Sequence, residues 1–368
     1  MTTSSDTGGP IAPPPSEEPA AVHDRESRAA DLRHFLSPEN ASVLYIYVVG
    51  FVIFSLWIPN LWLSFETQRS ILNISFPIPA LVAVGLVPSL LAGAFDLSIA
   101  GVMGAAAITS SWLVVDKGWS LPLALAAALG VALIAGMANG ALVVKVGMNS
   151  FIATLGTGAV LGAYAEWRSG GVQITGLPDS FKNLARGEIL WGVQAKVMYL
   201  IVAALVIWYV IEHTPIGRYL QATGDNADAA RLAGVQTSRY AFGALIAGAF
   251  IAGVAGIVQT ASISAGNANV GDPFLLTAFA AAFLGSTQFR GRFNVWGTVL
   301  AVWTLLSLVK GVELALQSYR WLNEFFFGSA LIAAVGMSKI FERRAARRAA
   351  AQRQRDASAA ESALAQAT

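Results

Sequence analysis

The chain of 368 residues contains no cysteine and only three histidines, His23, His34 and His213. The lack of cysteine excludes disulfide bonds and thiolate metal sites, and the redox state of the compartment cannot be read from the sequence. The three histidines are scattered and show neither the H-E-x-x-H pattern nor another paired spacing that serves a metal ion. The sequence therefore predicts a protein without a metal site.

Charged side chains are also scarce. Asp, Glu, Lys and Arg make up 12% of the residues, whereas hydrophobic residues make up 55%. A soluble domain has about 25% charged residues, so the few charges here cannot cover a water-exposed surface on a chain of this size. The composition excludes a soluble globular protein and predicts an integral membrane protein.

Nucleotide-binding and catalytic motifs are missing as well. The chain has no G-x-x-x-x-G-K-[ST] sequence, so it cannot by itself hold a nucleotide in a P-loop. The nearest glycine-rich run, at residues 156–162, has the wrong spacing for a dinucleotide fingerprint and lies inside an apolar run. We expect a chain that is not an enzyme and binds no cofactor of its own.

The apolar runs predict an all-α polytopic membrane protein with about ten transmembrane helices. Hydrocarbon about 30 Å thick needs roughly 20 helical residues for each crossing. The run at 273–288 is short, and a re-entrant helix is the alternative there. The ten runs are 43–63, 77–95, 97–115, 121–144, 149–167, 197–213, 239–261, 273–288, 293–312 and 322–341.

Two polar tails flank the transmembrane region, which extends over residues 43–341. Residues 1–42 are polar and proline-rich, which is typical of a disordered segment. Residues 342–368 begin with a dense cluster of Arg, which predicts a cytoplasmic position. An even number of spans then places both termini in the cytoplasm. We expect the basic cluster to contact anionic lipid and not nucleic acid.

Asp96 lies between two long apolar stretches, where an ionised carboxylate costs about 2.5–3.5 kcal/mol. Two compatible interpretations are open. Asp96 and Ser98 break one helix into two and cap the second half, or they line a polar path, since broken helices often border transport pathways. Asn139, Asn149 and Thr154 are further candidates for this path, although such residues more often bond a neighbouring helix.

A polar segment, residues 214–238, separates two apolar runs near the middle of the chain. It starts with Thr-Pro, a helix-start signal, and the first short helix is expected to end at Gly224. Asp225 or Asn226 then caps a second short helix that ends at Gly234. The second helix is rich in alanine, which suits a helix seated in a groove of another protein. An ordinary cytoplasmic loop is the alternative.

The sequence GRYLQATGDNADAARLAGV in this segment resembles the cytoplasmic coupling segment of permeases of ATP-binding-cassette importers, specifically the ribose/simple-sugar permease family. Three further blocks resemble that family in the same order: DLSIAGVMG at 96–104, NGALVVKVGMNSFIATLGT at 139–157 and GGVQITGLP at 170–178. The resemblance covers about residues 75–340. The coupling pattern is met by Gly217, Arg218, Ala222, Gly224, Asn226, Ala229, Ala230, Arg231 and Gly234.

The resemblance implies a permease subunit that imports a monosaccharide or a related small polar solute across the bacterial inner membrane. A second permease subunit, expected to be a copy of the same chain, would complete the pore, and an extracytoplasmic binding protein would deliver the solute. Separate ATPase subunits, which use ATP and Mg, would explain the missing P-loop. The residues implied to contact the ATPase are Gly217, Arg218, Gly224, Asn226, Ala229, Ala230, Arg231 and Gly234.

Two stretches depart from the family's pattern. Residues 274–279 replace a Glu-Leu-x-x-Ile-Ala-Ala block, and residues 287–296 replace a glycine-rich turn. These departures leave the solute open, and permeases for branched-chain amino acids or nucleosides are the first alternative. An ATP-independent secondary transporter is the second. It is disfavoured because Asp96 is the one clear titratable candidate inside the spans.

Overall fold

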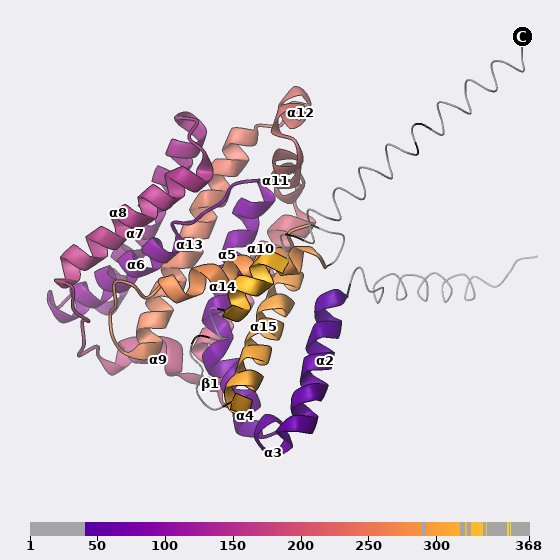
Figure 1. The fold of residues 1–368 in the computed structure, drawn as a ribbon. Helices are drawn as coiled ribbons and strands as arrows, with labels where there is room; N and C mark the ends of the chain where they lie inside the picture. Colours follow the sequence, from indigo (N-terminus) through magenta and orange to yellow (C-terminus); the bar gives the residue numbers. More distant parts are fainter. Residues whose placement is uncertain are drawn as a thin grey trace, which may run out of the picture.

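The computed structural model describes residues 41–288 and 292–316, together with residues 321, 325–333, 336, 352 and 354. The predicted tails, 1–42 and 342–368, therefore lie almost entirely outside the described residues. The described secondary structure is helical, with one antiparallel two-stranded hairpin (Figure 1). With η marking π-helical turns, the elements are α2 Ser42–Trp57, α3 Pro59–Trp62, α4 Phe65–Ser70, η1 Ile71–Ser75, α5 Pro77–Leu91, α6 Ile99–Val115, α7 Leu121–Gly140, η2 Ala141–Lys145, α8 Ser150–Ser169, α9 Asp179–Arg186, β1 Glu188–Leu190, β2 Val193–Gln194, α10 Ala195–His213, α11 Pro215–Asp225, α12 Ala227–Leu232, α13 Thr237–Ile263, α14 Asp272–Ser286 and α15 Val295–Leu316.

Helix α5 forms the centre of the bundle. Every residue from Pro77 to Leu91 is buried, as expected of a helix that is apolar on all sides. It packs against α13, α14, α10 and α15. The preceding helical residues, 65–75, meet α5 at an angle of 44°. Pro77 accounts for the bend, because proline has no N–H to continue the preceding helix but is tolerated at the first helical position.

Small residues let α13 approach α7 and α5 closely. A Cβ atom added at Gly136 of α7 would lie 2.8 Å from the Cα of Ile246 on α13, and one added at Gly248 would lie 3.1 Å from the backbone oxygen of Gly85 on α5. A Cβ atom does not fit at 2.8 Å, and one at 3.1 Å would force the neighbouring backbone to shift, so glycine is what permits this packing. Helix α13 therefore holds α5 and α7 in fixed positions around α6.

Helix length and composition support several membrane crossings but do not establish ten. Four helices are long and apolar enough to cross a bilayer, namely α7 with η2, α10, α13 and α15, and the bent pair formed by 65–75 and α5 is a fifth candidate. Helices α2, α6 and α14 are apolar but shorter, with 15–17 residues. The predicted run at 322–341 is described only in part. The number ten stays a prediction, whereas the all-α polytopic class agrees with the structure.

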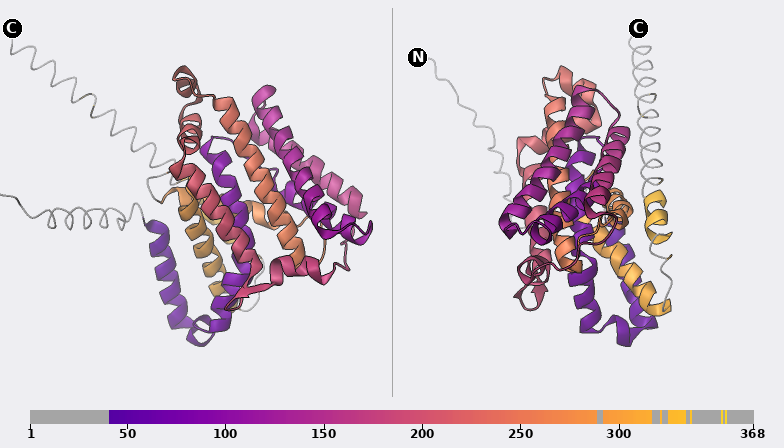
Figure 2. Two further views of the ribbon diagram at one scale, coloured as in Figure 1. Left: turned by 180° about the vertical axis from the view of Figure 1, so that it is seen from behind. Right: turned by 90° about the vertical axis from the view of Figure 1, so that its left-hand side faces the viewer.

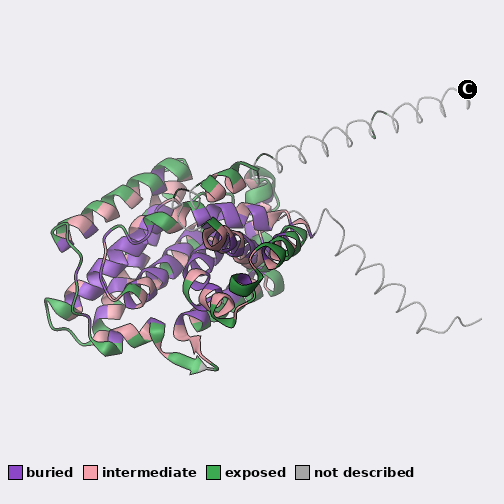
Figure 3. Ribbon diagram, turned by 60° about the horizontal axis from the view of Figure 1, so that its bottom comes forward, coloured by how far each residue is buried: buried purple, intermediate pink, exposed green. Residues whose placement is uncertain are grey.

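The short elements gather at the two ends of the bundle (Figures 1 and 2). Helices α11 and α12 lie at one end, and α3, α4, α9 and the hairpin lie at the other. Two long-range contacts tie down the second end: Arg69 pairs with Glu188 of the hairpin at 2.9 Å, and the Arg186 guanidinium donates to the backbone oxygen of Ser262. Figure 3 shows buried residues concentrated in the centre of the bundle.

Candidate functional site

Helices α11 and α12 have the shape that the sequence predicts. The Thr214 hydroxyl accepts a hydrogen bond from the Ile216 N–H at 3.2 Å and caps α11. The Asn226 side chain accepts from the Ala229 N–H at 3.0 Å and caps α12. Gly234 follows α12 with φ of +84°, a conformation that favours glycine. The cap is thus Asn226 and not Asp225, and α11 continues to Asp225, one residue beyond the predicted end.

The residues predicted to contact an ATPase divide into two groups. Gly217 and Ala230 are buried against the rest of the chain, and Gly217 lies so close to Ile211 that a Cβ atom would overlap its backbone. Arg218, Gly224, Asn226, Ala229, Arg231 and Gly234 are exposed. Arg231 forms an ion pair with Asp228. Sequence reasoning missed Leu232, whose side chain is 91% exposed at this end of the bundle.

The predicted break near Asp96 is confirmed, since α5 ends at Leu91 and α6 begins at Ile99. Burial alternates from residue to residue along the segment between them, residues 92–98, which begins with a turn at Gly93 and ends with helical dihedrals at Ser98. Gly93, Phe95 and Leu97 line a cavity. The intervening residues Ala94, Asp96 and Ser98 are buried in the bundle.

Polar side chains anchor the buried side of this segment. The Asp96 carboxylate accepts hydrogen bonds from the Ser98 N–H at 3.0 Å and from the Ser98 hydroxyl at 2.6 Å. The Asn139 amide of α7 donates to the Ser98 hydroxyl oxygen at 2.7 Å. From α8, the Ser150 and Thr154 hydroxyls accept from the Phe95 and Leu97 N–H groups, each at 3.0 Å. The break is therefore held from two neighbouring helices.

These contacts correct one sequence interpretation and leave the other open. Ser98 precedes α6, but its side chain caps no N–H of that helix and donates to Asp96 instead. The predicted cap of α6 is therefore wrong. Asn149 caps α8 through the Phe151 N–H at 2.9 Å. The structure joins Asp96, Ser98 and Asn139 directly, while the polar-path role stays a prediction.

The cavity beside the break has a volume of about 770 Å³. Its walls come from the break, α11, α14 and the segment before α15. Phe95 stacks on Phe279 and Phe283 with ring centroids 6.3 and 6.1 Å apart, so aromatic rings close one side. The lining residues are Leu90, Leu91, Gly93, Phe95, Leu97, Phe151, Gln221, Gly224, Asp225, Leu275, Leu276, Phe279, Phe283, Ser286, Arg292, Phe293 and Leu331.

Both stretches that depart from the family's pattern reach this cavity. Leu275, Leu276 and Phe279 come from the first stretch, and Arg292 and Phe293 come from the second. Helix α11 touches the end of α5 at Gly224, where an added Cβ atom would overlap the backbone oxygen of Leu91. Both residues line the cavity, so the coupling helix forms part of its wall. Among the described residues, no group of three His, Cys, Asp or Glu side chains is arranged to hold a metal ion.

A comparison with protein families assigns the chain. The family described as branched-chain amino acid transport system / permease component matches residues 70–335. The chain belongs to this permease family. The autoinducer 2 import system permease protein LsrC of Salmonella choleraesuis (strain SC-B67) is 30% identical over 300 residues, which cover 81% of this permease and 85% of the relative. The protein of the same name from Shigella flexneri is 32% identical over 274 residues, 74% and 79% of the two chains. No solved structure matches the permease.

The family assignment confirms the resemblance drawn from the sequence. The matched region covers the break, the cavity and the coupling helices α11 and α12. Members are described as permease components, which makes this permease a transport subunit. Together with its apolar helices, the assignment indicates a multi-pass membrane protein.

Proposed function

We propose that the permease is the membrane subunit of an ATP-binding-cassette importer that carries a monosaccharide or a related small polar solute across the bacterial inner membrane. The observation that carries this proposal is the capped helix pair α11–α12, exposed at one end of an apolar bundle and in contact with a cavity. The relatives, named as permeases of an autoinducer 2 import system, support import and a sugar-like solute.

Helix α12 provides the docking surface for a separate ATPase. Leu232 is 91% exposed and follows the Asp228–Arg231 ion pair, so an apolar side chain and two charges face outward together. A large apolar side chain at the centre of a polar rim is the usual composition of a protein interface. Ala230 faces inward, and its part is to let α12 lie close to the bundle.

The complete importer has several subunits in this proposal. Two copies of the permease enclose the translocation path, and two ATPases bind ATP and Mg at the α11–α12 end. An extracytoplasmic binding protein docks at the opposite end, where α9 and the hairpin lie (Figure 1). Both termini are then cytoplasmic. Closure of the ATPases pushes α11 against the break and changes the shape of the cavity.

The polar residues around the break support the path without lining the cavity. Ser98 bonds to both Asp96 and Asn139, all three residues are fully buried, and Thr154 holds the Leu97 backbone. Phe95 and its aromatic neighbours occupy the cavity side and form its closing element. Solute specificity then depends on residues that the partner copy and the opposite end supply.

A branched-chain amino acid is the alternative cargo, since the family's description names such a transport system. An amino acid carries an ammonium and a carboxylate group, which a path through the membrane must pair with fixed charges. The described cavity walls are mainly apolar, and their charged members are Asp225 and Arg292. Arg292 is already paired with Glu212, so the described lining offers no unpaired cation to the carboxylate of an amino acid. The uncharged polar solute therefore remains the preferred cargo.

Reconstitution tests the function directly. The permease is placed in liposomes with candidate ATPase and binding-protein subunits from the same organism, and uptake of radiolabelled monosaccharides, autoinducer 2 and branched-chain amino acids is measured. We expect uptake that requires ATP, the ATPase and the binding protein. Gradient-driven uptake by the permease alone would contradict the proposal and favour a secondary transporter.

One substitution tests the docking surface. Replacing Leu232 with Ser removes the exposed apolar side chain without disturbing the cap of α12, and the ATPase should no longer co-purify with the permease. Leu63, which is 55% exposed at the opposite end, gives the matched control L63S. Normal co-purification of L232S would show that α12 is not the docking surface.

A further inference from the structure

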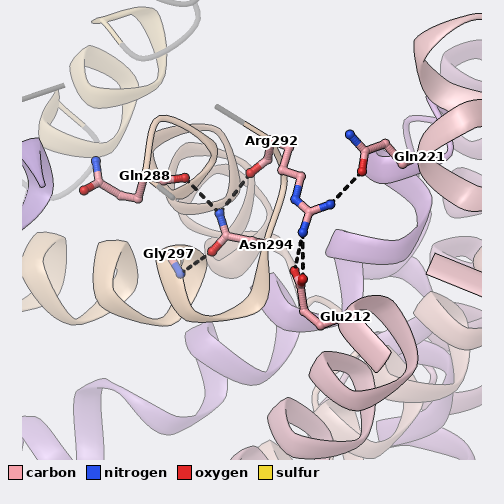
Figure 4. A network of polar contacts seen from close by, with 6 residues as sticks. All are labelled: Glu212, Gln221, Gln288, Arg292, Asn294 and Gly297. Atoms are coloured by element: carbon pink, nitrogen blue, oxygen red, sulfur yellow. Dashed lines mark hydrogen bonds and ion pairs between the residues drawn. The ribbon is translucent and has the colours of Figure 1, made fainter. Parts of the chain in front are cut away.

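Arg292 connects three elements that are distant in the sequence (Figure 4). It lies just before α15, at the end of the connection from α14. Its Nη2 atom donates to both carboxylate oxygens of Glu212, near the end of α10, at 2.9 and 2.6 Å. Its Nη1 atom donates to the side-chain oxygen of Gln221 on α11 at 2.7 Å. One guanidinium group thus bonds α10 and α11 at the same time.

The environment makes this contact stronger than an ordinary surface ion pair. The side chains of Arg292 and Glu212 are 29% and 30% exposed, so solvent screens them only in part. The planar guanidinium group directs its N–H groups in fixed directions, and a lysine at the same place cannot reproduce the fork. The contact therefore fixes both the distance and the orientation of α11 relative to residue 292.

Asn294 joins Arg292 to the start of α15. Its amide nitrogen donates to the backbone oxygens of Arg292 and Gln288 at 2.9 and 3.1 Å. Its amide oxygen accepts from the Gly297 N–H at 2.6 Å. Because Asn294 holds both sides of this connection, a displacement of Arg292 moves the end of α14 and the beginning of α15 together.

The other side of the link is equally firm. Gly217 of α11 packs directly on the backbone of Ile211, so α10 and α11 meet at a close-packed corner. Arg292 binds across that corner, to Glu212 on one helix and Gln221 on the other. A displacement of α11 therefore displaces Arg292 as well. From there it reaches α14, which carries the cavity residues Phe279 and Phe283.

We propose that Arg292 is the positioning residue that transmits movement of the coupling helix α11 to the α14 wall of the cavity. This inference rests on the proposed function, because it needs an ATPase to move α11. It assigns a role to Arg292, one residue of the stretch in which the chain departs from the family's pattern. In the absence of the Arg292 contacts, α11 still moves against the break, but the α14 wall of the cavity no longer follows it, and ATP hydrolysis is partly uncoupled from transport.

The test measures the number of solute molecules imported for each ATP hydrolysed by the reconstituted full complex. For Arg292→Gln this ratio should fall by about twofold to thirtyfold, the range of coupling changes for residues between two sites. Because Arg292 also lines the cavity, Glu212→Gln serves as the variant outside the lining: its ratio should fall as well, while its ATPase co-purification and ATP hydrolysis should stay near the wild-type values. Arg292→Lys keeps the charge but not the fork, and should give an intermediate ratio. Glu212→Gln combined with Arg292→Gln should be no worse than Arg292→Gln alone, because both remove the same link.

Lys310→Gln is the matched control, because Lys310 also forms a half-buried ion pair, at 3.6 Å with Glu313, but within α15 alone and with no second helix bridged. It should leave the ratio unchanged. A thermal unfolding scan of each purified variant separates a coupling defect from misfolding. If uptake and hydrolysis fall in parallel for Arg292→Gln, or if its ratio equals the wild-type ratio, the transmission role is wrong. If the wild-type complex itself fails to import with ATP, the proposed function fails instead.

Discussion

At the scale of single residues, Asp96 shows how the bundle accepts a carboxylate. The residue is fully buried, and one of its oxygens takes both hydrogen bonds from Ser98. The other oxygen, Oδ2, has no partner among the described residues, and the same is true of Asn139 Oδ1. The bonds that Asp96 does form fix the two residues that lead into α6. Its main contribution is therefore to the shape of the break.

Substitution at Asp96 distinguishes a structural role at the break from a direct contact with the solute. Asp96→Ala leaves the N–H and the hydroxyl of Ser98 without their acceptor, which costs about 1–3 kcal/mol of unfolding free energy. Asp96→Asn keeps an acceptor oxygen and should cost less. Thermal unfolding of the detergent-purified variants, followed by tryptophan fluorescence, measures the difference. If Asp96→Asn instead leaves the unfolding midpoint unchanged and raises the KM for uptake, Asp96 lines the path.

At the scale of elements, the approach of α11 to the break is the closest link between the coupling helices and the cavity. Gly224 faces the backbone of Leu91 and Gly93, and Gly93 itself has φ of +76°, which favours glycine. A side chain at Gly224 would overlap the backbone of Leu91, and one at Gly93 would be both crowded, 3.3 Å from the Cα of Gly224, and strained. The two glycines therefore let the coupling helix touch the chain that forms the cavity wall.

Gly224→Ala tests this approach. The added methyl group should push α11 away from the break at a cost of about 1–3 kcal/mol, as overpacking does, and uptake should fall. Gly243→Ala on α13 is the control, since no atom lies within 4 Å of the added methyl group. Uptake by the reconstituted complex and the unfolding midpoint are measured for both. Equal effects of the two substitutions would contradict the close-contact role of Gly224.

The elements that the sequence predicts well are those with local signals. Thr214 and Asn226 cap α11 and α12 through contacts two or three residues away, and the composition around Asp96 reveals the break. Arg292 could not be assigned in this way, because its partners lie 80 and 71 residues earlier. Only the packing of α10 against α11 brings them together. The cap of α6 could not be assigned in this way either, because the Ser98 hydroxyl donates to Asp96 and accepts from Asn139, which lies 41 residues later in the sequence.

At the scale of the whole molecule, the two ends of the bundle should face opposite sides of the membrane. The chain has no cysteine, so single introduced cysteines report on orientation without background. Asp179 and Asp228 have side chains that are 88% and 83% exposed, and each pairs with a residue three positions later. An impermeant maleimide should label Asp179→Cys in intact cells and Asp228→Cys only in inside-out vesicles. Labelling of both from one side would contradict the orientation.

Helices α6 and α14 begin next to each other in the interior of the bundle, since a Cβ atom at Gly271 would overlap the backbone of Ala100. Each helix N-terminus carries a partial positive charge of about +0.5 from its aligned peptide dipoles. Asp96 and Asp272 lie at these two ends and supply the opposite charge. The two carboxylates therefore outweigh the two half charges by about one negative charge. An uncharged solute that passes such a region moves no charge with it, so the membrane voltage neither drives nor opposes its import.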